Sequence, residues 1–208
     1  MKLYYTPGAG SLCCHIVAQE LGLPLKIVKV NLREKKSEEG DFLAVNPKGQ
    51  IPALVLENGE VLTEGVAILQ YLAAQKATEG LMPAAPGLAH YRALEWLNFT
   101  ATELHKNYTP LFFPDRFVAD EAARAQFVEG QRSALLKKLS WVDGELKGRA
   151  FVLGDRFTIC DAYLFTCLSW SRFVNLDTSS FEHLTAWMGR VGARPAVLAT
   201  LKAEGLLK

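Results

Sequence analysis

Residues 2–14, KLYYTPGAGSLCC, decide the fold that we predict for this chain. Residues 2–6 are rich in β-formers and are closed by Pro7 and Gly8, so they predict a buried strand. From Ser11 onward the apolar residues follow helical spacing until Gly22, which predicts a helix. KIVKV (residues 26–30) reads as the next strand and, since a helix connects the two, as parallel to the first.

A mixed sheet is completed further along the chain. REKKSEEG (residues 33–40) is polar and reads as a solvated loop. In QIPALVLENGEVLTEG (residues 50–65), the pair Asn58-Gly59 between two β-rich runs predicts a hairpin, because both residues tolerate the positive φ of a type I′ turn. Apolar residues at helical spacing from Val66 to Leu72 predict a helix that covers the sheet.

The second half of the chain changes character. Residues 76–87, KATEGLMPAAPG, lose periodicity and contain two prolines and two glycines, which is typical of an interdomain linker. Afterwards helices are predicted over residues 88–108, 120–146, 158–173 and 181–191 and after Pro195. The predicted plan is therefore an α/β domain (residues 1–78), a linker (79–86) and an all-α, helical-bundle domain (87–208).

Composition excludes several classes of function. The net charge is +1 and half of the residues are hydrophobic, without the basic stripe that nucleic-acid binding requires. No stretch approaches the roughly 20 apolar residues of a membrane span, and MKLYYTPGAG lacks the apolar core of a signal peptide, so we expect a cytoplasmic protein. The four cysteines have no zinc-type or disulfide-compatible spacing, so we expect reduced thiols and no metal site.

Six motifs in this order resemble bacterial glutathione transferases, most closely the beta class, over nearly the whole chain. They are YYTPGAGSL (4–12), NPKGQIPAL (46–54), LTEGVAILQYL (62–72), EWLNF (95–99), ELHK (103–106) and FTICDAYLF (157–165). The resemblance implies a thioredoxin-like N-terminal domain that binds glutathione, a helical domain for the second substrate, and a homodimer. It implies glutathione as co-substrate, no other cofactor, and thiolate attack on small hydrophobic electrophiles.

Such a reaction requires the thiol pKa to fall from about 8.5 toward neutrality. Donors and a helix N-terminus aimed at the sulfur would favour the thiolate, and a helix is predicted to begin at Ser11. The catalytic candidates are Ser11, Tyr5 and His105. Ser11 could instead only cap the helix, and strand alternation could send Tyr5 into the core. The family's usual cysteine before the serine is replaced here by Gly10.

Further residues match family positions around glutathione. Ile51-Pro52 would be a cis peptide that offers the backbone of Ile51 to the tripeptide, and Glu64-Gly65 would bind its γ-glutamyl end at a helix start. The complete set of expected binding residues is Gly10, Lys35, Gln50, Ile51, Pro52, Glu64, Gly65, Asn98 and Lys106. Lys35 could be an ordinary surface charge, and Lys36 could take its place.

Helical spacing places Asn98, Thr102 and His105 on one polar stripe, and the resemblance places Asn98, His105 and Lys106 across the cleft from glutathione. There His105 could shift the thiol pKa or carry its proton. Thr158 and Asp161 form a predicted capping box. Aromatic residues could wall a pocket for the electrophile or belong to the core: Tyr108, Phe112, Phe113 and Phe117.

Two other functions stay open at the level of sequence. The first is glutathione-dependent thiol-disulfide or peroxide reduction through Cys13, which Gly10 and the absence of a CxxC motif disfavour. The second is a non-catalytic protein that binds glutathione or another ligand. Cys13 and its neighbour Cys14 lie in the first helical turns, where buried thiols are common packing residues, and His15 shares a helix face with Ser11.

Overall fold

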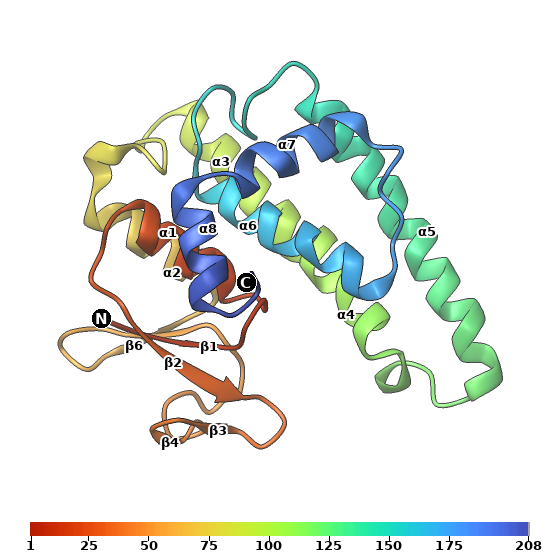
Figure 1. Cartoon of the computed structure of the whole chain (residues 1–208), viewed down its shortest axis with the longest axis horizontal. Coiled ribbons are helices and arrows are strands. Elements are labelled where there is room, and N and C mark those ends of the chain that lie inside the picture. Colours follow the sequence, from red (N-terminus) through yellow and green to blue (C-terminus); the bar gives the residue numbers. More distant parts are fainter. Residues whose placement is uncertain (208) are drawn as a thin grey trace.

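The computed structural model describes residues 1–207 and shows a sheet covered by helices beside a larger helical bundle (Figure 1). Lys208, the last residue of the expected helical domain, lies outside the described residues. The sheet order is β4-β3-β2-β1-β5-β6, with β1 and β2 parallel and all other neighbours antiparallel. The strands are β1 (Lys2–Tyr5), β2 (Lys26–Asn31), β3 (Lys36–Ser37), β4 (Gly40–Asp41), β5 (Ala53–Val55) and β6 (Val61–Thr63).

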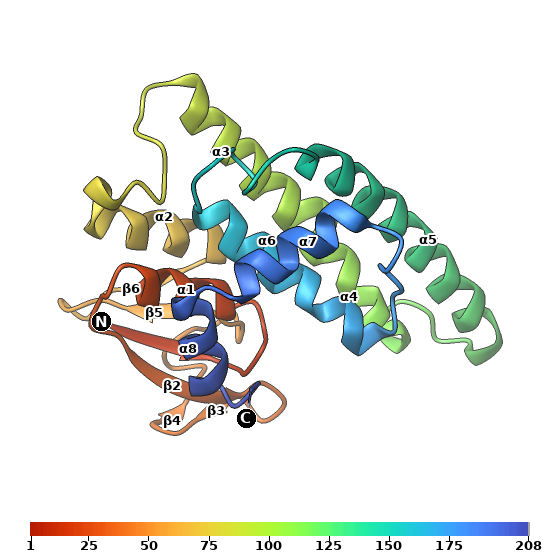
Figure 2. The same ribbon diagram turned by 45° about the horizontal axis from the view of Figure 1, so that its top comes forward.

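Alternation along β1 explains how the sheet is covered. Leu3 belongs to the main core under α1 (Leu12–Glu20) and α2 (Gly65–Gln75), whereas Tyr4 belongs to a small cluster that includes Phe42. Figure 2 shows α1 and α2 lying together on one side of the sheet. The predicted mixed sheet with a thioredoxin-like arrangement is therefore confirmed.

Two local predictions in this domain were wrong. The loop expected at residues 33–40 contains the short strand β3 and the first residue of β4, and Glu39 at their turn accepts hydrogen bonds from Lys2, Lys26 and the hydroxyl of Tyr4. The hairpin between β5 and β6 is present, but only Gly59 has a positive φ, 85°, and Asn58 does not. The Gly59 N–H instead donates to the carbonyl of Leu56, so the turn is not type I′.

The helical part is built around α6 (Ile159–Ser169), in which every residue from Ile159 to Leu168 is buried. It packs against α1, α3 and α7, and Figure 2 shows it inside the bundle. The other helical elements are α3 (Leu88–Phe99), the π-helix η2 (Thr100–His105), α4 (Lys106–Phe112), α5 (Glu121–Leu146), η4 (Trp170–Val174), α7 (Glu182–Gly192) and α8 (Pro195–Ala203), with short 3₁₀ turns η1 (Ala77–Glu79) and η3 (Pro114–Arg116).

One hydrophobic core joins the sheet side to the bundle. Residues of α1, α2 and β1 share a single cluster with residues of α3, α5 and α6, and α8 returns at the end of the chain to pack on α1 (Figure 1). The division into residues 1–78, 79–86 and 87–208 thus stays a prediction about sequence organisation. Among residues 1–207, no helix is long and apolar enough to cross a membrane.

Candidate functional site

The loop between β1 and α1 is held by groups from the other end of the chain. Gly8, at φ +69°, donates its N–H to Oε2 of Glu204 at 2.9 Å, and its carbonyl accepts the indole N–H of Trp170 at 2.7 Å. Oε1 of Glu204 lies 3.0 Å from Nδ1 of buried His15. The loop that precedes Gly10 and Ser11 is therefore anchored on both sides, by residues that sequence reasoning missed.

Ser11 stands at the start of α1, but its side chain does not cap the helix. Its hydroxyl lies against the backbone of Thr6, with the Thr6 N–H at 3.3 Å and the Thr6 carbonyl at 3.4 Å. Ser11 has no exposed surface. The capping bond that its residue type allowed is thus absent, and the hydroxyl ties the loop together.

Gly10 lies directly against the imidazole of His105. A Cβ at Gly10 would stand 3.0 Å from Cε1 and 3.8 Å from Nε2 of that ring, which is tighter than ordinary packing. His105 therefore borders the space that a side chain at position 10 would enter. The structure brings together these two residues, which are far apart in sequence, at the N-terminus of α1.

The π-helix η2 sets the direction of His105. An i→i+5 turn holds more residues than an α-helical turn and changes the phase of the residues that follow it. His105 consequently turns inward, where Nδ1 lies 2.8 Å from the hydroxyl of Tyr163 and the ring meets Trp170 edge-on with centroids 4.7 Å apart. Burial lowers the pKa of His105 to about 4, so the imidazole is neutral at physiological pH.

The same π-helix separates residues that were expected to share a stripe. Asn98 and Thr102 are exposed, whereas His105 is half-buried against Gly10. Lys106, the first residue of α4, is exposed. The prediction of one continuous polar stripe is therefore wrong, because it assumed an unbroken α-helix.

Tyr5 ends β1 close to the same loop. Its ring is largely buried and lies edge-on to His15, with centroids 6.4 Å apart. Burial raises the pKa of Tyr5, with smaller contributions from the carboxylates of Glu204 and Glu38, so its hydroxyl remains protonated. No hydrogen bond of this hydroxyl occurs among the described residues, which leaves a free phenol donor.

The loop before β5 carries the next group of expected residues. Nζ of Lys35 donates to the carbonyl of Gly49 at 2.8 Å, and the buried Asn46 amide donates to the carbonyl of Gln50 at 2.6 Å. Ile51-Pro52 is a cis peptide, as the resemblance implied. Lys35 is thus half-buried beside the loop and is not a free surface charge.

Glu64 heads α2 in an unusual backbone conformation, φ 69° and ψ 114°, outside the region that non-glycine residues prefer. Backbone strain of this kind concentrates at functional sites. Its exposed carboxylate pairs with Nζ of Lys48 at 2.5 Å. The next residue, Gly65, begins the helix beside Pro52, whose ring would lie 3.8 Å from a Cβ there.

The four cysteines are buried and unpaired. The Cys13 thiol donates to the carbonyl of Gly10 at 3.1 Å and lies 3.9 Å from the sulfur of Cys14. Burial raises the pKa of the Cys14 thiol well above its ordinary value and does the same for Cys167. These are the properties of packing thiols, which agrees with the expectation of reduced cysteines. Within the described residues, no group of side chains is arranged to hold a metal ion.

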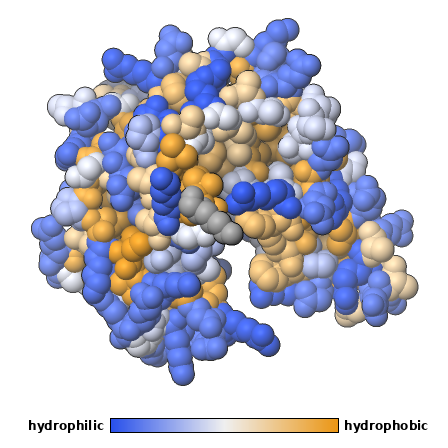
Figure 3. Space-filling model, in the orientation of Figure 1, coloured by the Kyte–Doolittle hydropathy of each residue, from blue (hydrophilic) through white to orange (hydrophobic). Residues whose placement is uncertain are grey.

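Three phenylalanines at and just beyond the end of α4 are exposed. Figure 3 shows a notch between the lobe that carries β2–β4 and the lobe at the end of α4, and the surface on the helical side is largely apolar. Phe112, Phe113 and Phe117 are all substantially exposed. Tyr108 is fully buried and bonded to the hydroxyl of Ser171 at 2.7 Å, so it belongs to the core and not to a pocket wall.

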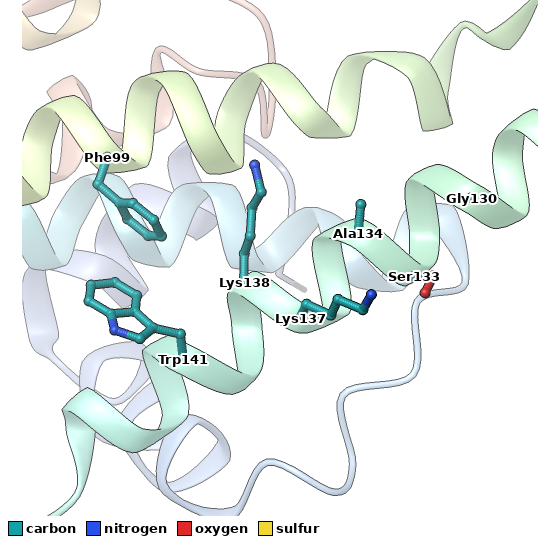
Figure 4. Close-up of a pocket in the computed structure, with 7 residues that line it drawn as sticks. All are labelled: Phe99, Gly130, Ser133, Ala134, Lys137, Lys138 and Trp141. Carbon is teal, nitrogen blue, oxygen red and sulfur yellow. The ribbon is translucent and has the colours of Figure 1, made fainter.

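Two grooves lie on a different face of the helical part, along α3 and α5. The first, about 560 Å³, is lined by α5 residues together with Phe99 (Figure 4). The second, about 940 Å³, continues it and shares Phe99 and Trp141. Trp141 is 48% exposed and stacks on Trp96 with centroids 5.3 Å apart. This face is therefore an apolar surface away from Gly10.

Comparisons with known proteins agree with these features. A model of the glutathione S-transferase N-terminal domain matches residues 11–75, and one of the C-terminal domain matches residues 99–195. Over 207 residues the chain is 47% identical to glutathione S-transferase GstA of Escherichia coli O157:H7, covering 99% of this chain and 100% of that protein.

Solved structures extend the likeness to three dimensions. A sphingomonad glutathione S-transferase complexed with glutathione is 43% identical, with a TM-score of 0.90 and 100% of both chains covered. A beta-class glutathione S-transferase of Sphingomonas chungbukensis is 42% identical, with a TM-score of 0.91 and 100% of both chains covered. The similarity therefore extends over the sheet, the helical bundle and the loops between them.

Proposed function

Because the chain belongs to the glutathione S-transferase family and resembles its bacterial beta class, we propose that it activates the glutathione thiol beside Gly10 for attack on small hydrophobic electrophiles. The observation that carries this proposal is the position of His105. Its imidazole lies against Gly10 at the start of α1, where the family's cysteine is missing.

Thiolate formation at this place has two sources of support. The backbone N–H groups at the N-terminus of α1 favour an anion, and this effect is strongest within the first turn. The neutral imidazole of His105 and the free hydroxyl of Tyr5 add polar groups near the same loop. Ser11 positions the loop through Thr6, and we propose that it acts in this way and not by direct contact with sulfur.

The tripeptide would extend from this loop across the sheet domain. Its cysteinyl backbone would pair with Ile51 before Pro52, and its γ-glutamyl end would reach Glu64 and the N-terminus of α2 at Gly65. Lys35 and Gln50 would lie along the glycyl end, since the Lys35 ammonium already binds this loop. Asn98 and Lys106 complete the proposed set from the helical side.

In the reaction, the glutathione thiol loses its proton to water and keeps the electron pair on sulfur. The thiolate then forms a carbon–sulfur bond as the electrophile's leaving group departs with its own electron pair. The exposed phenylalanines at the end of α4 offer an apolar surface for such an electrophile. No metal or further cofactor has a part in this scheme.

We also propose a cytoplasmic homodimer that acts in detoxification. The apolar face along α3 and α5 supports a partner copy, since its grooves are lined by Trp141 and Phe99. The free cysteines support a reducing compartment. Conjugation of hydrophobic electrophiles would make them water-soluble, which is the basis for the proposed detoxification.

The reductase alternative finds no support, because the Cys13 thiol is fully buried and donates to Gly10. A simple binding protein would use the same glutathione loops without turnover. The geometry of His105 favours chemistry, because its neutral, half-buried imidazole borders the space at Gly10 where we propose that the sulfur lies.

The test is conjugation of glutathione to a generic aryl halide, together with retention on immobilised glutathione. We expect turnover by the wild type and, for His105→Ala, a loss of kcat on the order of 10²-fold with retention unchanged. Cys13→Ala is the matched control and should keep full activity. Retention without turnover would leave only the binding protein, and loss of activity in Cys13→Ala would revive the thiol mechanism.

A further inference from the structure

Tyr163 determines what His105 can do. The Tyr163 hydroxyl lies 2.8 Å from Nδ1 of His105, and it has no other hydrogen-bond partner among the described residues. Tyr163 sits in the middle of α6, at 5% exposure, so its ring cannot turn toward water. This contact joins two elements, η2 and α6, and no pattern in the sequence connects them.

The direction of this hydrogen bond follows from burial. If the imidazole donated from Nδ1, the phenolic proton would remain buried without an acceptor, at a cost of about 1–3 kcal/mol. If the phenol donates, its proton is satisfied and the imidazole carries its own proton on Nε2. No buried side-chain nitrogen or oxygen among the described residues lacks a partner, so Nε2, which has none in the protein, is accessible to solvent. Both groups are then satisfied.

The protonation states are consistent with this direction. Burial lowers the pKa of His105 to about 4, which makes it a neutral ring and a weak base. Burial also raises the pKa of Tyr163, so the phenol keeps the proton that it donates. A neutral imidazole with its Nδ1 accepting has only one hydrogen, and that hydrogen is on Nε2.

We propose that Tyr163 is a positioning residue that holds His105 as the Nε2–H tautomer, so that His105 donates a hydrogen bond to the glutathione thiolate and does not remove the thiol's proton. This inference rests on the proposed function. Nε2 lies 3.8 Å from the point where a Cβ of residue 10 would stand, so the N–H borders the space left by the missing cysteine. The thiol proton leaves to water, and the sulfur electron pair gains a donor.

The decisive experiment is nitrogen NMR of the imidazole rings in protein labelled with ¹⁵N-histidine, at neutral pH. His105→Gln identifies the signals of His105 among the four histidines. We expect the wild type to carry hydrogen on Nε2, and Tyr163→Phe to shift His105 toward a mixture of the two tautomers. Tyr108→Phe is the matched control, because it removes an equally buried phenol–hydroxyl bond, to Ser171, and should leave the His105 signals unchanged.

Kinetics and thiolate absorbance then separate positioning from general stability. In Tyr163→Phe we expect kcat to fall on the order of tenfold, less than the 10²–10³ for removal of a donor itself. The pKa of bound glutathione should rise while the KM for glutathione changes little.

Two outcomes overturn the proposal. The first is hydrogen on Nδ1 of His105 in the wild type, which can be measured even if Tyr163→Phe does not fold. The second is a Tyr163→Phe protein in which both the His105 signals and kcat are those of the wild type. A wild type that binds glutathione without turnover would refute the proposed function instead, since the tautomer and the thiolate absorbance can still be measured.

Discussion

At the scale of single residues, Gly10 and His105 form a complementary pair. The absent side chain of Gly10 leaves room for the imidazole edge, and a Cβ there would approach Cε1 to 3.0 Å. Glycine at position 10, where the resemblance to the beta class implies a cysteine, therefore has a consequence beyond the absence of a thiol. It allows His105 to approach the helix start, where a thiolate is best stabilised.

Gly10→Cys should convert the site from conjugation toward disulfide exchange. A thiol at a helix N-terminus has a lowered pKa, so its thiolate attacks oxidised glutathione and releases one glutathione thiolate. We expect an added glutathione in the intact mass, removed by reductant, and a stability loss of about 1–3 kcal/mol as the imidazole shifts.

Gly10→Ala is the control for this change, because it introduces the same Cβ without sulfur. It should show the stability loss and no adduct. The wild type should also remain unmodified, since its four cysteines are buried. An unmodified Gly10→Cys protein would contradict the assignment of this loop to the sulfur site.

His105 should impose a pH dependence on stability. Its pKa is lowered from about 6.5 to about 4 in the folded state. Between these two pH values the unfolded chain therefore binds more protons than the folded protein. Its contribution to the free energy of unfolding is therefore complete above pH 6.5 and is lost as the pH falls toward 4. Urea unfolding at several pH values should show a steeper loss for the wild type than for His105→Gln. Parallel curves would show that the imidazole remains solvated.

Sequence motifs could name candidate residues for the site, but they could not supply the contacts that hold those residues in place. The motifs named Gly10 and His105, which lie against each other in the structure, and the Ile51-Pro52 peptide, which is cis. The Tyr163–His105 and Trp170–Gly8 contacts were missed, because they join positions more than 50 residues apart that no local periodicity relates. Ser11 was a natural cap by residue type, yet a local bond to Thr6 competes for its hydroxyl.

At the scale of elements, the π-helix η2 is the feature that sequence patterns describe least well. Residues 88–108 have helical periodicity, and a helix was predicted there without interruption. An extra residue in one turn leaves composition unchanged while it redirects every side chain beyond it. The short strands β3 and β4 were hidden for a related reason, since ion pairs of Glu39 hold a segment whose composition is that of a loop.

The capping box that begins α6 was predicted correctly and should dominate the stability of that helix. Asp161 is buried and accepts the N–H groups of Val152 and Thr158, the Thr158 hydroxyl and the indole N–H of Trp187. Asp161→Ala leaves these donors buried without an acceptor, and we expect a loss on the order of 4 kcal/mol in urea unfolding.

The stability of Asp161→Asn should lie between that of the wild type and that of Asp161→Ala. Asparagine retains one acceptor oxygen but turns an NH₂ group toward the other donors. Asp155→Ala, an exposed carboxylate just before the same helix, is the matched control and should change stability by less than about 0.5 kcal/mol. An equal effect of both alanine variants would show that the buried network contributes nothing specific.

At the scale of the whole molecule, the site depends on contacts between the two ends of the chain. Glu204, after α8, accepts the N–H of Gly8 and bonds to His15 on α1. Glu204→Ala should loosen the loop without touching the ligand. We expect faster amide hydrogen exchange over residues 6–15, weaker glutathione binding, and a stability loss of about 2–3 kcal/mol.

Glu204→Gln retains an acceptor for Gly8 and should preserve most of this protection. Exposed Glu129 on α5 provides the control, since Glu129→Ala removes a carboxylate without a buried contact. If exchange over residues 6–15 stayed slow in Glu204→Ala, the loop would be held by Trp170 alone.

The proposed dimer makes the last prediction, and it concerns the apolar face along α3 and α5 (Figure 4). Trp141 stacks on Trp96 and meets Phe99 at 4.7 Å between centroids, so half of its ring remains available to a partner. Burial of aromatic surface is a main source of affinity at interfaces, and a charge placed there would have to be desolvated. We therefore expect Trp141→Glu to weaken dimerisation at least about tenfold, or 1.4 kcal/mol, in sedimentation velocity. Phe173→Glu alters an aromatic of similar exposure beside Arg172 and should leave the dimer intact. Loss of the dimer in Phe173→Glu, or an unweakened dimer in Trp141→Glu, would place the interface on another face.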